Sequence, residues 1–169
     1  MSWDPSQYSK EDVHYRFLRL YSIDLNMARQ SLALLSRYRR ADVRHAIFRD
    51  VVVGYARPFS SNRDHRKRTH ELSLRHVPKT IRPLHKELMK LRHQLFAHTD
   101  FAARQPSVTR WQGSVKAQFP MSFSNPPYDA WLRRSAEILE LLEAVEESIR
   151  KELTELEEGC SWNPVAPAT

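Results

Sequence analysis

The chain has 169 residues, a formal net charge of +7, 41% hydrophobic residues and three glycines. This length and hydrophobic content suit one folded domain with a proper core, and so few glycines argue against a glycine-rich nucleotide loop. No apolar run approaches the roughly 18–20 residues that a membrane span needs, and no signal-peptide segment is recognisable at the N-terminus. A single cysteine, Cys160, excludes an internal disulfide. It fits a reducing cytosol, so we expect a cytoplasmic protein with no membrane attachment.

The positive charge is unevenly distributed along the chain. The net charge is +4 over residues 1–60, +7 over 61–93, +3 over 94–134 and −7 over 135–169. Solvated helix faces that balance one another within the fold are one explanation. The segment 61–93 leads directly into a candidate site, and there a polyanionic partner is the better interpretation.

Apolar periodicity predicts the first two helices, over residues 9–36 and 41–57. Ser9 is a plausible N-cap of the first helix, with Asp12 completing an acidic capping pattern. The first helix has two apolar rows that we expect to merge into one buried face: Val13, Phe17, Leu20, Met27 and Leu34, and beside them Leu18, Tyr21, Leu25, Ala28, Leu32 and Leu35.

Asp24 lies near the middle of that face, where an unpaired carboxylate would be costly. One interpretation is an ion pair that holds the bundle together. The other is a supporting role in a site, in which Asp24 orients Arg57, Arg92 or a histidine.

The most polar stretch follows, over residues 60–78, and we interpret it as a basic loop. Four of its cations suit contacts with nucleic-acid phosphates, which give affinity without sequence specificity: Arg63, Arg66, Lys67 and Arg68. A solvated loop without a ligand is the alternative.

The next helix is predicted over residues 78–97, with one apolar stripe formed by Leu84, Leu88, Leu91 and Leu95. At roughly 100° per residue, Arg92 and His98 fall on opposite sides of this stripe, so both border the buried face. His93 points away from the core.

Period-2 alternation over Val115, Ala117, Phe119, Met121 and Phe123 predicts a strand. Gln112-Gly113 could turn a short hairpin after Val108–Trp111, so we expect a small β insertion that covers one end of the bundle. The last helix is predicted over residues 128–157, and residues 159–169 are expected to form a disordered tail.

The stretch Leu-Arg-His-Gln-Leu-Phe-Ala-His-Thr-Asp at residues 91–100 resembles the Arg-x(4–6)-His signature of the HEPN-domain superfamily. It is similar to the Leu-Arg-Asn-Lys-x-x-Ala-His-x-Asp wording of abortive-infection-type members, with His93 in place of the Asn. These proteins are small α-helical bundles, and many are metal-independent endoribonucleases that act as toxins, abortive-infection factors or CRISPR-associated effectors. The resemblance in architecture covers residues 10–157.

The resemblance implies an all-α protein: a four-helix bundle of HEPN type over residues 1–158, with a small β-hairpin insertion between the third and fourth long helices. It implies RNA cleavage by attack of the ribose 2′-OH, with Arg92 and His98 as the catalytic residues. His93, Asp24 and Asp100 are possible supporting residues. No cofactor is needed, and because related proteins pair two such motifs, one motif per chain implies a homodimer.

His98 suits general acid or base chemistry near neutral pH, and Arg92 suits a bidentate contact with the scissile phosphate. Other interpretations stay open. Arg92 and His98 can be ordinary helix-end residues, or the chain can be a HEPN module that binds RNA or a nucleotide without cutting. It can also be an interaction protein or defence component held inactive by a regulatory partner. No metal site is expected, because the histidine spacings do not match a zinc-binding helix pair.

Overall fold

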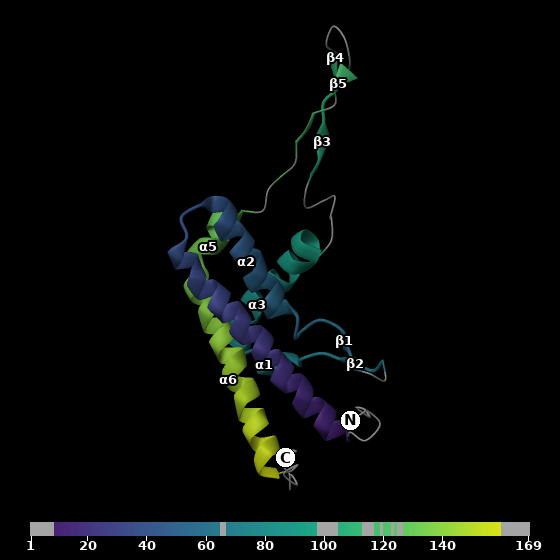
Figure 1. Cartoon of the computed structure of the whole chain (residues 1–169), viewed down its shortest axis with the longest axis vertical. Helices are drawn as coiled ribbons and strands as arrows, with labels where there is room; N and C mark the ends of the chain where they lie inside the picture. Colours follow the sequence, from purple (N-terminus) through teal and green to yellow (C-terminus); the bar gives the residue numbers. More distant parts are fainter. Residues whose placement is uncertain are drawn as a thin grey trace, which may run out of the picture.

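The computed structural model describes residues 9–64, 67–97, 105–112, 117–118, 120–122, 124 and 127–159, and helices make up most of them (Figure 1). Most of the hydrophobic core comes from α1 (Lys10–Leu34), α2 (Ala41–Ala56), α3 (Arg82–Leu91) and α6 (Ser135–Gly159). α1 packs against both α2 and α6, and α3 contacts the same two helices. The predicted all-α class is confirmed, because the strands described are short antiparallel pairs.

The start of α1 forms as its sequence predicts. The backbone N–H of Asp12 donates to Ser9 Oγ, and the backbone N–H of Ser9 donates to Asp12 Oδ2, each at 3.0 Å. These two reciprocal bonds satisfy N–H groups that have no partner inside the helix. The helix ends at Leu34 and is followed by a 3-10 turn, η2 (Leu35–Arg37).

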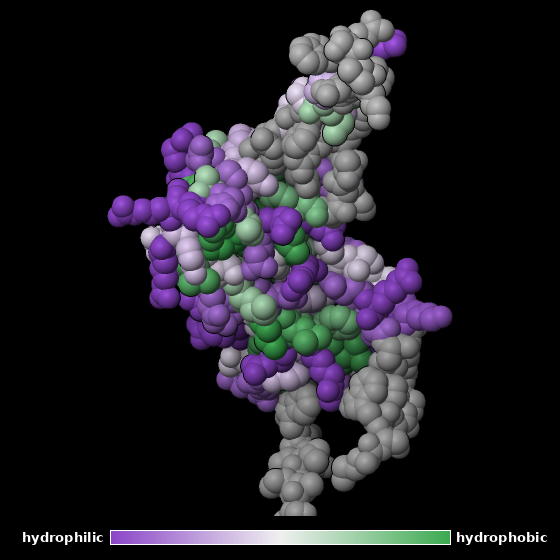
Figure 2. Space-filling model, turned by 45° about the horizontal axis from the view of Figure 1, so that its top comes forward, coloured by the Kyte–Doolittle hydropathy of each residue, from purple (hydrophilic) through white to green (hydrophobic). Residues whose placement is uncertain are grey.

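The prediction that both apolar rows of α1 are buried is wrong for part of the first row. Leu20 and Met27 are 54% and 50% exposed, and Ile23 between them is 55% exposed. The reason is that α2 and α6 both pack against the other side of α1. Figure 2 shows hydrophobic side chains gathered in a patch among hydrophilic ones on the face of the molecule where α1 lies.

α1 and α2 approach each other closely at Gly54. A Cβ atom at this position would lie 3.2 Å from the Cβ of Ala28, so the glycine allows the two helices to meet. Beside this contact, Asp24 of α1 accepts a hydrogen bond from Arg57 Nη1 at 3.2 Å. The ion pair predicted for Asp24 is therefore confirmed, and its partner is the residue that ends α2 rather than Arg92.

The basic stretch after α2 is more regular than the predicted loop. Strands β1 (Asn62–Arg63) and β2 (Thr69–His70) pair as a short antiparallel hairpin. The ring of His70 stacks on Phe17 of α1 with 4.2 Å between the ring centres, which fixes the hairpin against the bundle. Two 3-10 turns follow, η3 (Leu74–His76) and η4 (Lys79–Ile81).

The helix predicted over residues 78–97 is regular only in its middle part. After η4, α3 begins at Arg82 with Pro83 in its first turn, where a missing N–H is tolerated. Leu84, Leu88 and Leu91 are buried as predicted. From Arg92 the backbone continues as a π-helical turn, η5 (Arg92–Ala97), so the prediction of one continuous α-helix is wrong here.

The β insertion is a ribbon of two short ladders. β3 (Ser107–Val108) pairs with β6 (Met121–Ser122), and β4 (Trp111–Gln112) pairs with β5 (Ala117–Gln118). Gln112 pairs with Ala117 at the end of this ladder, and Gly113 lies outside the described residues, so the predicted turn at Gln112-Gly113 stays a prediction. Figure 1 shows β3, β4 and β5 extending away from the helices, so the ribbon does not cover an end of the bundle as predicted.

The last predicted helix is interrupted at Arg134, which separates α5 (Tyr128–Arg133) from α6. The Arg134 guanidinium pairs with Glu87 of α3 at 2.6 Å and with Glu137 at 3.0 Å, so α3 and α6 are joined at this break. The predicted apolar stripe is confirmed, since all its members are buried: Leu132, Ile138, Leu142, Val145, Ile149 and Leu153.

The expected tail at residues 159–169 lies outside the described residues except for Gly159, the last residue of α6. Among the described residues, no helix combines the length and apolar character that crossing a bilayer requires.

Candidate functional site

The motif turn η5 lies at the edge of the core. Arg92, its first residue, is half-buried, and its guanidinium makes no hydrogen bond or ion pair with any residue in the described part of the chain. The ring of Phe96 stacks on Tyr128 at 6.3 Å between ring centres, and Tyr128 stacks on His45 of α2 at 4.0 Å. These ring contacts hold the turn against α2 and α5.

The other predicted site residues are not gathered around Arg92 within the described part of the chain. His93 is exposed, as its helical position predicts. Asp24 is paired with Arg57. His98 and Asp100 lie outside the described residues, so their predicted roles stay predictions.

The predicted phosphate-binding cations differ in their surroundings. Asp64 accepts hydrogen bonds from the backbone N–H of Arg68 at 2.8 Å and from its guanidinium at 2.7 Å. Burial opposes ionisation of Asp64, but these hydrogen bonds outweigh it and lower the pKa of the carboxyl well below its usual range. Arg68 is therefore engaged within the hairpin, whereas Arg63 and Lys67 are exposed. Arg66 lies outside the described residues.

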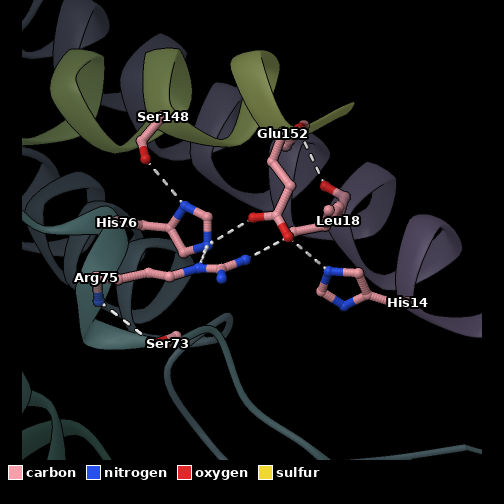
Figure 3. A network of polar contacts seen from close by, with 8 residues as sticks. His14, Leu18, Ser73, Arg75, His76, Ser148 and Glu152 are labelled. Atoms are coloured by element: carbon pink, nitrogen blue, oxygen red, sulfur yellow. Dashed lines mark hydrogen bonds and ion pairs between the residues drawn. The ribbon is translucent and has the colours of Figure 1, made fainter. Parts of the chain in front are cut away.

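A second polar group, which we call the Glu152 cluster, joins three elements (Figure 3). It comprises His14 of α1, Arg75 and His76 of η3, and Ser148 and Glu152 of α6. Glu152 Oε1 accepts hydrogen bonds from His14 Nε2 at 2.8 Å and from Arg75 Nη2. Glu152 Oε2 lies 3.1 Å from His76 Nε2, and His76 Nδ1 lies 3.0 Å from Ser148 Oγ.

The surroundings of the cluster set its charge states. His76 is only 3% exposed, and burial lowers the pKa of its imidazole. Burial would raise the pKa of Glu152, but hydrogen bonds from His14 and Arg75 outweigh it and lower that pKa. At neutral pH the cluster therefore holds an ionised carboxylate beside a neutral, buried imidazole.

This cluster lines a cavity with a volume of about 490 Å³. Its walls are Arg75, His76, Ser148, Lys151, Glu152, Glu155 and Leu156. Although two imidazoles contact one carboxylate here, no group of three or more His, Cys, Asp or Glu side chains within the described ranges has the arrangement of a metal site.

Two buried histidines show what the sequence analysis missed. His76 falls within the predicted basic loop, yet the carboxylate beside it, Glu152, comes from α6, far along the chain. His85 of α3 is buried, and its Nδ1 lies 2.8 Å from Tyr55 Oη. The apolar residues Leu74 and Val77 on either side of Arg75-His76 were the available signal for burial of His76.

Comparisons with protein-family models, with curated proteins and with solved structures find no match in any of the three. Function is therefore inferred from the residues themselves and from where the fold places them.

Proposed function

We propose that this chain is a metal-independent endoribonuclease of HEPN type that cleaves RNA through Arg92 and His98. One observation supports this most: Arg92 begins a π-helical turn at the edge of the core, half-buried and with no partner among the described residues. π-Helical turns inside α-helices occur frequently at functional sites. A guanidinium that is not paired with any described residue is available for a phosphate, whose oxygens it can bind in a bidentate manner.

The chemistry assigned to the two residues follows from their side chains. Arg92 holds the scissile phosphate and stabilises the negative charge that develops in the transition state. His98 acts as general base toward the ribose 2′-OH or as general acid toward the departing 5′-oxygen. The products are a 2′,3′-cyclic phosphate and a 5′-hydroxyl, and no step requires a metal ion.

A homodimer with a composite cleft completes the proposal, together with a role in a defence or toxin system. On a regular α-helix, Arg92 and His98 would be roughly 120° apart, so one helix would not bring the two side chains face to face. Two copies of the motif that approach one another would place the arginine of one protomer near the histidine of its partner. A regulatory protein that holds the activity off is part of the same proposal.

RNA affinity in this proposal comes mainly from the basic segment before the motif. Residues 61–93 carry ten Lys or Arg against three Asp or Glu. Arg63 and Lys67 lie exposed on the β1–β2 hairpin, where they can reach phosphates without breaking an internal ion pair. Contacts of this kind supply affinity that falls with salt.

The test is cleavage of a labelled RNA by the purified full chain in the presence of a chelator. His98→Ala should slow cleavage by about 10²–10⁴-fold, the usual contribution of a positioned acid or base. His93→Ala is the matched control, because it removes an exposed imidazole from the same turn. Equal rates for the wild type and His98→Ala would refute the proposal. A wild type that binds RNA and never cuts it would favour the binding-module alternative.

A further inference from the structure

The connection between α1 and α2 exposes an aromatic ring among arginines. It runs through residues 37–40, which we call the α1–α2 corner, with the sequence Arg-Tyr-Arg-Arg. All four residues are exposed, and Tyr38 is 46% exposed. Turns in proteins are usually built from Gly, Pro, Asn, Asp or Ser, because these residues favour the backbone geometry of a turn. Formation of the turn therefore does not account for this sequence.

The ring of Tyr38 has no partner in the described part of the chain. It makes no ring contact there, and its hydroxyl makes no hydrogen bond. Other tyrosines differ in this respect. Tyr128 stacks on His45 with 4.0 Å between the ring centres, and Tyr55 Oη lies 2.8 Å from a nitrogen of His85. The Tyr38 ring therefore adds little to the packing of the fold and is available to a ligand.

The charge around Tyr38 is strongly positive. Residues 36–49 hold five arginines against one acidic residue, Asp42. Arg40 Nε donates to Asp42 Oδ1 at 3.1 Å, so this arginine is engaged. Three arginines are exposed and have no ion pair with another residue of the described ranges: Arg37, Arg39 and Arg49. Guanidinium groups bind phosphate oxygens in a bidentate manner and stack on planar groups. The corner therefore suits a polyanion that also carries rings, which is a nucleic-acid strand.

A row of aromatic rings connects the corner with the motif turn. His45 lies in the second turn of α2, directly after the corner, and its ring is within 13° of parallel to that of Tyr128. The Tyr128 ring is within 18° of parallel to that of Phe96 in η5. Figure 1 shows α5, which begins at Tyr128, beside the end of the bundle where α1 and α2 join. A strand bound at the corner can therefore lead toward Arg92.

The corner differs from the β1–β2 hairpin in what it can contact. The two lie at opposite ends of α2, whose 16 residues span about 24 Å. The hairpin offers exposed cations, and contacts between cations and phosphates occur with single and double strands alike. An exposed aromatic ring stacks on a base that is free of a duplex. The corner therefore favours unpaired nucleotides.

We propose that the α1–α2 corner binds single-stranded RNA. One unpaired base stacks on Tyr38, and Arg37 and Arg39 contact the phosphates on either side of it. This site assigns unpaired RNA as the substrate class of the proposed ribonuclease, and in that respect it rests on the proposed function. It is a binding site and takes no part in the chemistry at Arg92 and His98, so it can be tested without cleavage.

The first experiment measures binding to the full-length chain by fluorescence anisotropy. The probes are a short single-stranded 2′-O-methyl RNA, which has no free 2′-OH, and an abasic strand of the same length and charge. Tyr38→Leu should weaken binding of the strand with bases by about 5–150-fold, the usual effect of one stacked base, and leave binding of the abasic strand unchanged. Tyr38→Phe, the matched control, keeps the ring and should bind like the wild type.

Two results of this experiment would overturn the proposal. One is that Tyr38→Leu keeps the preference of the wild type for the strand with bases. The other is that the wild type binds both strands equally, which would favour an acidic protein surface as the partner of the arginines.

The second experiment tests the arginines through the salt dependence of the same binding. The double variant Arg37→Gln, Arg39→Gln should reduce the slope of log affinity against log salt by about 1.4, or 0.7 for each phosphate contact. Arg150→Gln is the control, because it removes the same charge from α6, where the guanidinium is engaged with Glu147. An unchanged slope in the double variant would contradict the phosphate contacts.

The two proposals fail separately in these measurements, because the 2′-O-methyl strand has no nucleophile for attack on its phosphates. A wild type that prefers the strand with bases and leaves ordinary RNA uncut would support the corner and refute the proposed ribonuclease. A wild type that cuts ordinary RNA and shows no preference for bases would support the ribonuclease and refute the corner.

Discussion

The Glu152 cluster and the motif turn differ in whether their charged side chains are paired. In the cluster, His14, Arg75 and His76 all contact one carboxylate from α6. In the motif turn, the guanidinium of Arg92 lies half-buried without a partner among the described residues.

This difference follows from the cost of burying charge. A charge deep in a protein must be paired, and removing one partner leaves the other at a high energetic cost. A half-buried charge keeps part of its hydration and can exchange that water for a ligand. We therefore expect substitutions in the cluster to change the free energy of unfolding, and substitutions in the motif turn to change activity.

The largest effect is expected when two arginines are compared. Arg92→Ala should slow RNA cleavage by about 10²–10³-fold, the usual loss when a charge-stabilising donor is removed. Its free energy of unfolding should stay within about 0.5 kcal/mol of the wild type. Arg75→Ala should leave the cleavage rate unchanged, because its guanidinium contacts Glu152 and not the motif. Cleavage assays measure the rates of both variants, and urea titrations measure their stability. If Arg75→Ala lost cleavage and Arg92→Ala did not, the assignment of the activity to the motif turn would be wrong.

Removal of the shared carboxylate should give the largest loss of stability. Glu152→Ala removes the carboxylate that accepts hydrogen bonds from His14 and Arg75 and lies 3.1 Å from the buried imidazole of His76, and leaving such groups without their partner costs about 1–3 kcal/mol. Glu155→Ala is the control, since Glu155 is exposed and lines the same cavity. Its effect should stay within about 0.5 kcal/mol. Equal stability of the two variants in urea titrations would show that the cluster does not hold the three elements together.

Acidification should weaken the fold through the buried histidines. Burial lowers the pKa of both His76 and His85 below the ordinary value of 6.5. Their unfolded forms therefore bind protons first as the pH falls, so stability is full above pH 6.5 and declines as the pH drops toward the lowered pKa values. Thermal unfolding between pH 7.5 and 5 should show this decline. His76→Gln should show a shallower decline, with the remainder due to His85, and an unchanged slope would contradict this role.

The smallest effect is expected on the β1–β2 hairpin, from the salt dependence of RNA binding. Arg63→Gln and Lys67→Gln should each reduce the slope of log affinity against log salt by about 0.7, the value for one phosphate contact on a single strand. Arg68→Gln should leave the slope unchanged, because its guanidinium is engaged with Asp64. Fluorescence anisotropy at several salt concentrations measures the slopes. If Arg68→Gln were the only variant to reduce the slope, the phosphate contact would belong to Arg68 and not to Arg63 and Lys67.

Features of the fold that depend on neighbouring residues could be predicted from the sequence. The N-cap at Ser9 is an example, because Ser9 and Asp12 are only three positions apart in the sequence. The buried stripe of α6 is another, since apolar spacing along one helix decides it. The burial of Leu20 and Met27 could not be decided in this way, because it depends on where α2 and α6 pack.

The candidate sites were predictable to different degrees. The position of Arg92 at the border of the core follows from the stripe of α3. The π-helical turn that begins at Arg92 does not, because it reflects how η5 packs against α2. The Glu152 cluster draws residues from α1, η3 and α6, and no spacing within one segment reveals such a meeting. The sequence contains His76, but it does not indicate which residues contact this side chain in the fold.

Analysis of the RNA ends tests the central claim most directly. The purified wild type is incubated with a defined single-stranded RNA in excess chelator, and the fragments are identified by mass spectrometry. The proposal predicts 2′,3′-cyclic phosphate and 5′-hydroxyl ends, absent with Arg92→Ala and with His98→Ala. Fragments that carry 3′-hydroxyl ends, or cleavage that stops when the chelator is added, would contradict it.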